Sequence, residues 1–112
     1  SGPITGRAFV VDYDTSAAGS PLEGFEEGDI LVCSMVHPMW LSYVLKSAGV
    51  VSEVGGWLSH MSIVAREHGI PMLVGADGLQ RFDTGQILEA SAEGDIRAVR
   101  MEPQLKVVSL AE

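Results

Sequence analysis

The chain has 112 residues, and its 7 basic and 15 acidic side chains give a net charge of −8. This length fits one domain with a real core, but not a complete nucleotide-dependent enzyme with separate substrate sites. The acidic excess, with no apolar run of about 20 residues and no secretory signal, predicts no nucleic-acid partner and no membrane partner.

The first elements in chain order are two apolar runs with β character. Arg7–Val11 is the first, and a loop rich in small and turn-forming residues follows it from Asp14 to Pro21. The turn Glu26–Asp29 then leads into a second strand, Ile30–Cys33.

Cys33 is the only cysteine of the chain, so no intramolecular disulfide can form. It follows the apolar residues Ile30 to Val32, which is typical of a small buried side chain in a reducing cytoplasm. A reactive thiol is the alternative. We therefore expect a cytoplasmic protein.

A helix is predicted after Pro38, because proline suits a first helical turn. Within Met39–Ala48, the residues Trp40, Val44, Leu45 and Ala48 share one face at helical spacing, and Gly49 is a plausible stop. The stretch Val50–Val54 then has the composition of a strand.

The second half of the chain alternates short elements and turns. The pair Gly55-Gly56 breaks the third strand, a short helix is predicted over His60–His68, and Gly69 ends it. Three strands are expected next, which are Met72–Val74, Gln86–Ala90 and Ile96–Val99. The turn Ala92–Asp95 joins the last two. The tail triplet Lys106–Val108 is either a linker or an edge strand. Mixed strands with two short helices predict an α/β or α+β domain.

The segment around His60 carries the residues best suited to chemistry. Ser59 is a good N-cap type, which would place His60 at the first helical position. A helix N-terminus disfavours the imidazolium, so a neutral nucleophilic ring persists near neutral pH, and it stabilises an anion formed there. Gly55, Gly56 and Ser59 are the candidate neighbours of a phosphoryl group. A histidine at a helix start is also common as a plain surface or capping residue.

The remaining polar residues favour structural interpretations. Cys33, His37, His60 and His68 lack the close spacing of zinc ligands, so no metal site is predicted. Arg66 and Glu67 fit an ion pair or a solvated face, and His68 suits a helix C-terminus. Ser59 does not stand in the Gly-x-Ser-x-Gly pattern of a serine hydrolase.

The run Gly55–Glu67, continued by Gly69-Ile70-Pro71 and Val74-Gly75, resembles the signature of the mobile domain of phosphoenolpyruvate-utilising enzymes. This family includes pyruvate phosphate dikinase, phosphoenolpyruvate synthase, enzyme I of the sugar phosphotransferase system and the rifamycin phosphotransferases. Glu27–Val32, Pro38–Trp40 and Ala48–Glu53 are also similar to the family pattern. The likeness extends over most of the domain.

The resemblance implies a swivelling β/β/α fold in which His60 is the phosphorylated residue. Residues 1–112 would form one phosphohistidine domain, either part of a larger multidomain enzyme or a separate subunit. In the dikinase branch, an ATP-binding domain with Mg²⁺ phosphorylates this histidine, and the domain rotates to an acceptor-substrate domain. The resemblance therefore implies a phosphotransferase of the dikinase type, with ATP and Mg²⁺ on the partner and no cofactor bound here.

Two departures from the family pattern bear on the acceptor. Leu58 stands where many members have Thr, and Met61 where they have small Ala or Thr, so a hydroxyl is lost and bulk is added beside His60. These changes favour a rifamycin-type or phenol-type phosphotransferase over a pyruvate dikinase. Trp57 is either a packing residue or a contact surface for a partner domain.

Two functional hypotheses follow. One is a catalytic phosphocarrier domain, which the intact His60 in its Gly-Gly-x-x-Ser context favours. The other is a degenerate swivel domain that only binds or bridges partners. The isolated chain is not expected to turn over ATP, because it lacks a Gly-x-x-x-x-Gly-Lys-Ser/Thr loop.

Overall fold

The computed structural model describes residues 3–11, 21–53, 58–91 and 93–101, with the side chains of all of these except 58–60. The described residues form six strands, two α-helices and two short 3₁₀ helices. The strands are β1 (Ile4–Val10), β2 (Ile30–Cys33), β3 (Gly49–Ser52), β4 (Met72–Val74), β5 (Gln86–Ala90) and β6 (Ile96–Met101). The helices are η1 (Pro38–Trp40), α2 (Leu41–Lys46), α3 (Leu58–Glu67) and η2 (Leu79–Arg81).

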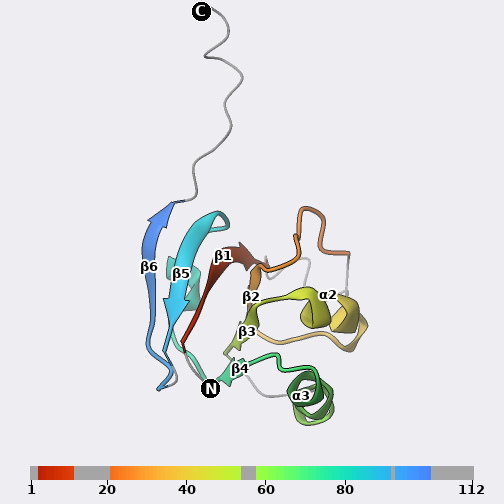
Figure 1. Ribbon diagram of the computed structural model, residues 1–112. Helices are drawn as coiled ribbons and strands as arrows, with labels where there is room; N and C mark the ends of the chain where they lie inside the picture. Colours follow the sequence, from red (N-terminus) through yellow and green to blue (C-terminus); the bar gives the residue numbers. More distant parts are fainter. Residues whose placement is uncertain (1–2, 12–20, 54–57, 92, 102–112) are drawn as a thin grey trace, which may run out of the picture.

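The six strands form one mixed sheet in the order β4-β3-β2-β1-β5-β6 (Figure 1). The strands β1 to β4 are mutually parallel, whereas β5 runs antiparallel to β1 and β6 antiparallel to β5. The pairs β2–β3 and β3–β4 are each joined through a helix, as parallel neighbours require. The expected domain of mixed strands with two short α-helices is confirmed.

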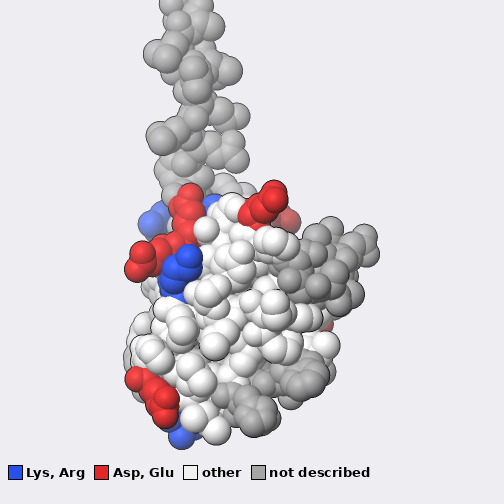
Figure 2. Space-filling model, turned by 90° about the vertical axis from the view of Figure 1, so that its right-hand side faces the viewer, with Lys and Arg blue, Asp and Glu red and all other residues white. Residues whose placement is uncertain are grey.

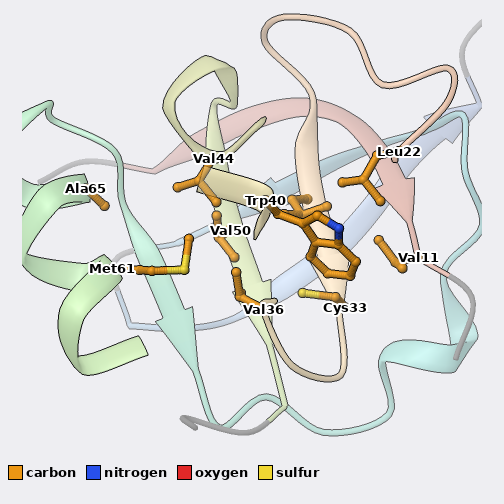
Figure 3. Close-up of a cluster of buried hydrophobic side chains, with 10 residues drawn as sticks. Val11, Leu22, Cys33, Val36, Trp40, Val44, Val50, Met61 and Ala65 are labelled. Atoms are coloured by element: carbon orange, nitrogen blue, oxygen red, sulfur yellow. The ribbon is translucent and has the colours of Figure 1, made fainter. Parts of the chain in front are cut away.

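Alternation along the central strands divides the core into two layers. Leu31 and Val50 face the side covered by α2 and α3, whereas Val32 and Val51 face the side covered by η2. On the helical side, Trp40 lies over Cys33 and Val11, and Met61 projects from α3 toward the sheet (Figure 3). Among the residues that the structure describes, the buried members of this helical layer are Val11, Leu22, Leu31, Cys33, Val36, Trp40, Val44, Val50, Met61 and Ala65.

A buried carboxylate fixes the turn that precedes β2. Asp29 accepts hydrogen bonds from Arg7 on β1, at 2.9 Å from Nε and 2.5 Å from Nη2, and from the backbone N–H of Glu26 at 2.9 Å. The backbone N–H of Asp29 donates back to the carbonyl of Glu26 at 3.0 Å. This network joins the turn to both strands, so the acidic turn identified in the sequence has a structural role.

The boundaries of the first α-helix and of β3 differ from the prediction. Gly49 does not stop the helix: α2 ends at Lys46, where the Ser47 hydroxyl donates to the Val44 carbonyl at 2.8 Å. Gly49 is instead the first residue of β3, and a Cβ there would lie 2.5 Å from Ile4 Cδ1. The same Cβ would lie 3.2 Å from the carbonyl oxygen of Pro71, so glycine serves close packing here rather than a helix end.

The strand β3 is also shorter than the predicted Val50–Val54. Its last residue, Ser52, pairs with Cys33, which is the last residue of β2. The pairing of β3 with β2 therefore ends at Ser52. Val54 lies outside the described residues, as do the predicted tail strand Lys106–Val108 and most of the predicted loop Asp14–Pro21. Among the described residues, no helix is long and apolar enough to cross a membrane.

Candidate functional site at the start of α3

The end of β3, from which the chain leads to α3, is firmly anchored. The buried Ser52 donates its hydroxyl hydrogen to the carbonyl of Ser34 at 3.1 Å, and its own carbonyl accepts from the N–H of Gly75 at 2.9 Å. The N–H of Glu53 donates to the carbonyl of Cys33 at 3.3 Å. These bonds tie the exits of β2, β3 and β4 together, so the point of departure toward α3 is fixed.

His60 lies in the first turn of α3, because the helix spans Leu58–Glu67 and His60 is its third residue. Ser59 is the second residue, so its predicted role as the N-cap is wrong. Leu58 already adopts helical backbone, which agrees with the better helix propensity of Leu over Ser. The predicted phosphoryl-site glycines Gly55 and Gly56, together with Trp57, lie outside the described residues.

The helix α3 has one face in the core and one in solvent. Met61 and Ala65 are 6% and 0% exposed and pack in the helical layer, whereas Ile63 is 59% exposed. His60 precedes the exposed Ile63 by three residues in this helix, and its own side chain lies outside the described ones. Met61 anchors the helix to the sheet (Figure 3), and its effect on the histidine stays a prediction.

The C-terminal end of α3 is closed by a Schellman motif. The N–H of Gly69 donates to the carbonyl of Arg66 at 3.1 Å, and that of Ile70 to the carbonyl of Ala65 at 2.8 Å. Gly69 has the positive φ of 73° that this motif needs, which confirms it as the helix stop. His68 lies 3.0 Å from the carbonyl of Val64 through Nδ1, consistent with its predicted structural role.

The other residues considered as ligands or nucleophiles lie apart from one another. His37 caps η1, where its Nδ1 accepts from the N–H of Met39 at 3.1 Å. Cys33 is buried, and burial, with a smaller contribution from Glu53, raises the pKa of its thiol to about 12. The interpretation of Cys33 as a small buried side chain is thus confirmed. In the part of the chain that the structure describes, no group of His, Cys, Asp and Glu could hold a metal ion.

A cavity of about 370 Å³ lies beyond the carboxyl ends of β1 and β2. Val10 and Val32 contribute apolar wall, and Glu53, Asp83 and Thr84 contribute polar groups. Because these residues come from separate segments, the sequence carried no signal for them. The carboxyl edge of a parallel sheet is the usual place for ligands in α/β folds, and α3 begins only five residues after Glu53.

The sheet order, the helical layer and a histidine in the first turn of α3 are the features expected of a mobile domain of the phosphoenolpyruvate-utilising class. Residues 25–94 match the family described as "PEP-utilising enzyme, mobile domain", and the chain belongs to this family. Two relatives are the rifampicin phosphotransferase of Bacillus subtilis, 40% identical over 82 residues, and the phosphoenolpyruvate synthase of Aquifex aeolicus, 40% identical over 93 residues. The matches cover 73% and 81% of this chain.

These relatives are far longer than the chain, which spans 9% of the first and 10% of the second. The chondramide synthase of Chondromyces crocatus is 44% identical over 69 residues, which are 61% of this chain and 2% of that enzyme. Among solved structures, the NMR structure of Enzyme I has a TM-score of 0.58 at 24% identity. That match covers 80% of this chain and 37% of the chain in that structure, and it confirms the fold.

Proposed function

We propose that this chain is the phosphohistidine carrier domain of a longer, cytoplasmic phosphotransferase, with His60 as the residue that carries the phosphoryl group. The observation that carries the proposal is the position of His60 in the first turn of α3. The family match over residues 25–94 includes this helix, which supports the same assignment.

The first turn of α3 suits a group that alternates between a neutral ring and an anion. The first N–H groups of a helix have no partner within it, and the helix dipole adds partial positive charge there. The first turn has no acidic residue, so no carboxylate within it repels the incoming phosphoryl group. A phosphorylated His60 would therefore be stabilised where it forms.

The transfer consists of two displacements at phosphorus. A neutral imidazole nitrogen of His60, which we assign as Nε2, attacks the phosphoryl group of the donor nucleotide. The N–P bond forms as the P–O bond to the leaving nucleotide breaks, and the leaving oxygen keeps the electron pair. In the second step an acceptor oxygen attacks phosphorus, the N–P bond breaks and its electrons return to the imidazole, while the acceptor's proton is lost to solvent or a base.

ATP, Mg²⁺ and the acceptor belong to partner domains in this proposal. An ATP-binding domain donates the phosphoryl group, and an acceptor-substrate domain receives it. The chain has no phosphate-binding loop motif of its own, and the relatives are about eight times its length, which leaves room for both partners. Relatives named for rifampicin and for phosphoenolpyruvate match equally well, at 40% identity, so the proposal leaves the acceptor open.

The test is covalent labelling of this chain by the ATP-binding domain of its own enzyme, with Mg²⁺ and ATP. Intact-protein mass spectrometry at alkaline pH, where phosphohistidine survives, should find one phosphoryl group. His60→Ala should abolish the labelling and leave the fold intact, since alanine is the best helix former and His60 lies within α3.

His68→Ala and His37→Ala are matched controls, because a ring nitrogen of each residue lies within hydrogen-bond distance of a backbone group. Both variants should be labelled like the wild type. If an active donor leaves the wild-type chain unmodified, the chain is a binding or bridging module. If His60→Ala is labelled as well as the wild type, the carrier residue is misassigned.

A further inference from the structure

The cavity beyond the carboxyl ends of β1 and β2 is closed on one side by the segment 79–84, which contains η2. Val32, Leu79 and Phe82 belong both to its lining and to the buried core beneath it, so this part of the wall is apolar. Its volume of about 370 Å³ and its place at the carboxyl edge of parallel strands are typical of small-molecule sites.

Hydrogen bonds to β1 hold the segment that closes the cavity. The N–H of Val10 donates to the hydroxyl oxygen of Thr84 at 2.9 Å. The N–H of Gly85 donates to the carbonyl of Ala8 at 3.0 Å. On the other side, the hydrogen bonds at the exits of β2 and β3 fix the wall in the same way. The cavity is therefore preformed, and a ligand would bind with little ordering of the chain.

The charged residues in the described lining of the cavity are acidic. Glu53 and Asp83 line it, and none of the lining residues that the structure describes is Lys, Arg or His. Cys33 adds no charge near neutral pH, because burial and the neighbouring Glu53 raise the pKa of its thiol to about 12. The guanidinium of Arg81 donates to three backbone carbonyls and lies over the ring of Phe82. The cavity therefore repels phosphates and carboxylates and attracts a cation.

The combination of apolar wall and carboxylates selects the kind of cation. In the part of the chain that the structure describes, no group of His, Cys, Asp and Glu could hold a metal ion. On the helical side of the molecule, uncharged residues fill the centre and charged side chains gather toward the margins (Figure 2). A cation attracted only by the net charge of −8 would therefore contact scattered carboxylates, whereas one with an apolar body would gain a second contact in the cavity.

We propose that this cavity is a binding site for a small organic cation. The apolar body of the ligand lies against Val32 and Phe82, and its ammonium group faces Glu53 and Asp83. The site goes beyond the proposed phosphoryl transfer, because its carboxylates disfavour a phosphoryl group and binding there does not involve His60.

The test uses three aromatic probes of similar size: the cation phenethylammonium, the neutral phenethyl alcohol and the anion phenylacetate. Amide NMR spectra of the chain follow each titration at neutral pH. Phenethylammonium should bind with a Kd of roughly 1 mM and shift the amides of residues 32–34 and 79–84. The alcohol should bind about tenfold more weakly, and the anion should cause no saturable shift.

The two carboxylates can be neutralised with little change of shape. The double variant Glu53→Gln, Asp83→Asn should weaken phenethylammonium about tenfold and leave the affinity for phenethyl alcohol unchanged. Asp83→Asn alone, at an exposed position, should keep the fold and weaken the cation about threefold. Glu67→Gln is the matched control, because Glu67 is exposed on α3 and does not line the cavity, and it should bind the cation like the wild type.

Four results would overturn the inference: equal affinity for the cation and the alcohol, saturable shifts only outside the cavity, no loss in the double variant, or an equal loss in Glu67→Gln. In each case the cavity would not be a site for a cation. Labelling of His60 is not measured in this experiment, so its outcome leaves the proposed function untouched.

Discussion

The substitution Met61→Ala tests whether the residue next to His60 anchors the helix or shapes the site. Met61 is 6% exposed and packs in the helical layer with Val44 and Val50. The substitution removes Cγ, Sδ and Cε, which at about 0.8 kcal/mol per methylene-sized group is about 2.4 kcal/mol of lost transfer free energy. A contribution from the cavity brings the expected loss of unfolding free energy to about 3 kcal/mol. Urea denaturation followed by circular dichroism measures this loss, and at an m-value of roughly 1.5 kcal/mol/M it lowers the midpoint by about 2 M.

Two further variants make the result specific to the buried face of α3. Met61→Leu nearly conserves volume and should cost less than about 1.5 kcal/mol. Ile63→Ala, on the exposed face, should change stability by no more than about 0.5 kcal/mol. At a temperature where Met61→Ala remains folded, its enzymatic labelling should stay within about threefold of the wild type. If Met61→Ala lost less than about 1 kcal/mol of unfolding free energy and was no longer labelled, Met61 would not be a core residue but part of the site.

Two other predictions concern the sheet. Asp29→Ala removes the acceptor for Arg7 and for the N–H of Glu26, so urea denaturation should show a loss of about 3 kcal/mol in the free energy of unfolding. The double variant Arg7→Ala, Asp29→Ala should lose less than the sum of the two single losses. For Cys33, the pKa is 9.0 in the unfolded chain and about 12 in the fold, so the folded state retains a proton that the unfolded state loses. The thiol's contribution to stability should therefore be constant below pH 9 and be lost as the pH rises toward 12. Cys33→Ala should abolish that part of the decline, and an unchanged slope would contradict the prediction.

Elements with a strong local signal could be predicted from the sequence. The strands Ile30–Cys33, Met72–Val74 and Gln86–Ala90 have the predicted boundaries, because short apolar runs between turn residues leave few alternatives. Gly69 was predicted as a helix stop from its residue type alone, and the Schellman motif gives the physical reason. The family resemblance, rather than periodicity, singled out His60.

The errors occur where tertiary contacts override a local rule. Gly49 looks like a helix stop in the sequence, but its lack of a Cβ serves the approach of Ile4. The burial of Met61 could not be inferred from its place after His60, because successive helical residues are about 100° apart and need not share a face. The cavity at the carboxyl edge could not be predicted, since Glu53 and Asp83 meet there only after the chain has folded.

The division of α3 into two faces bears on how a carrier domain can work at two sites. The buried contacts of Met61 and Ala65 hold the helix on the sheet. In the proposed function, His60 would therefore move with the whole domain rather than with a loose helix. Each additional 1.4 kcal/mol of contact with a donor would lengthen the bound state about tenfold. A broad apolar surface around the histidine would thus hold the domain at the first partner and slow the delivery to the second.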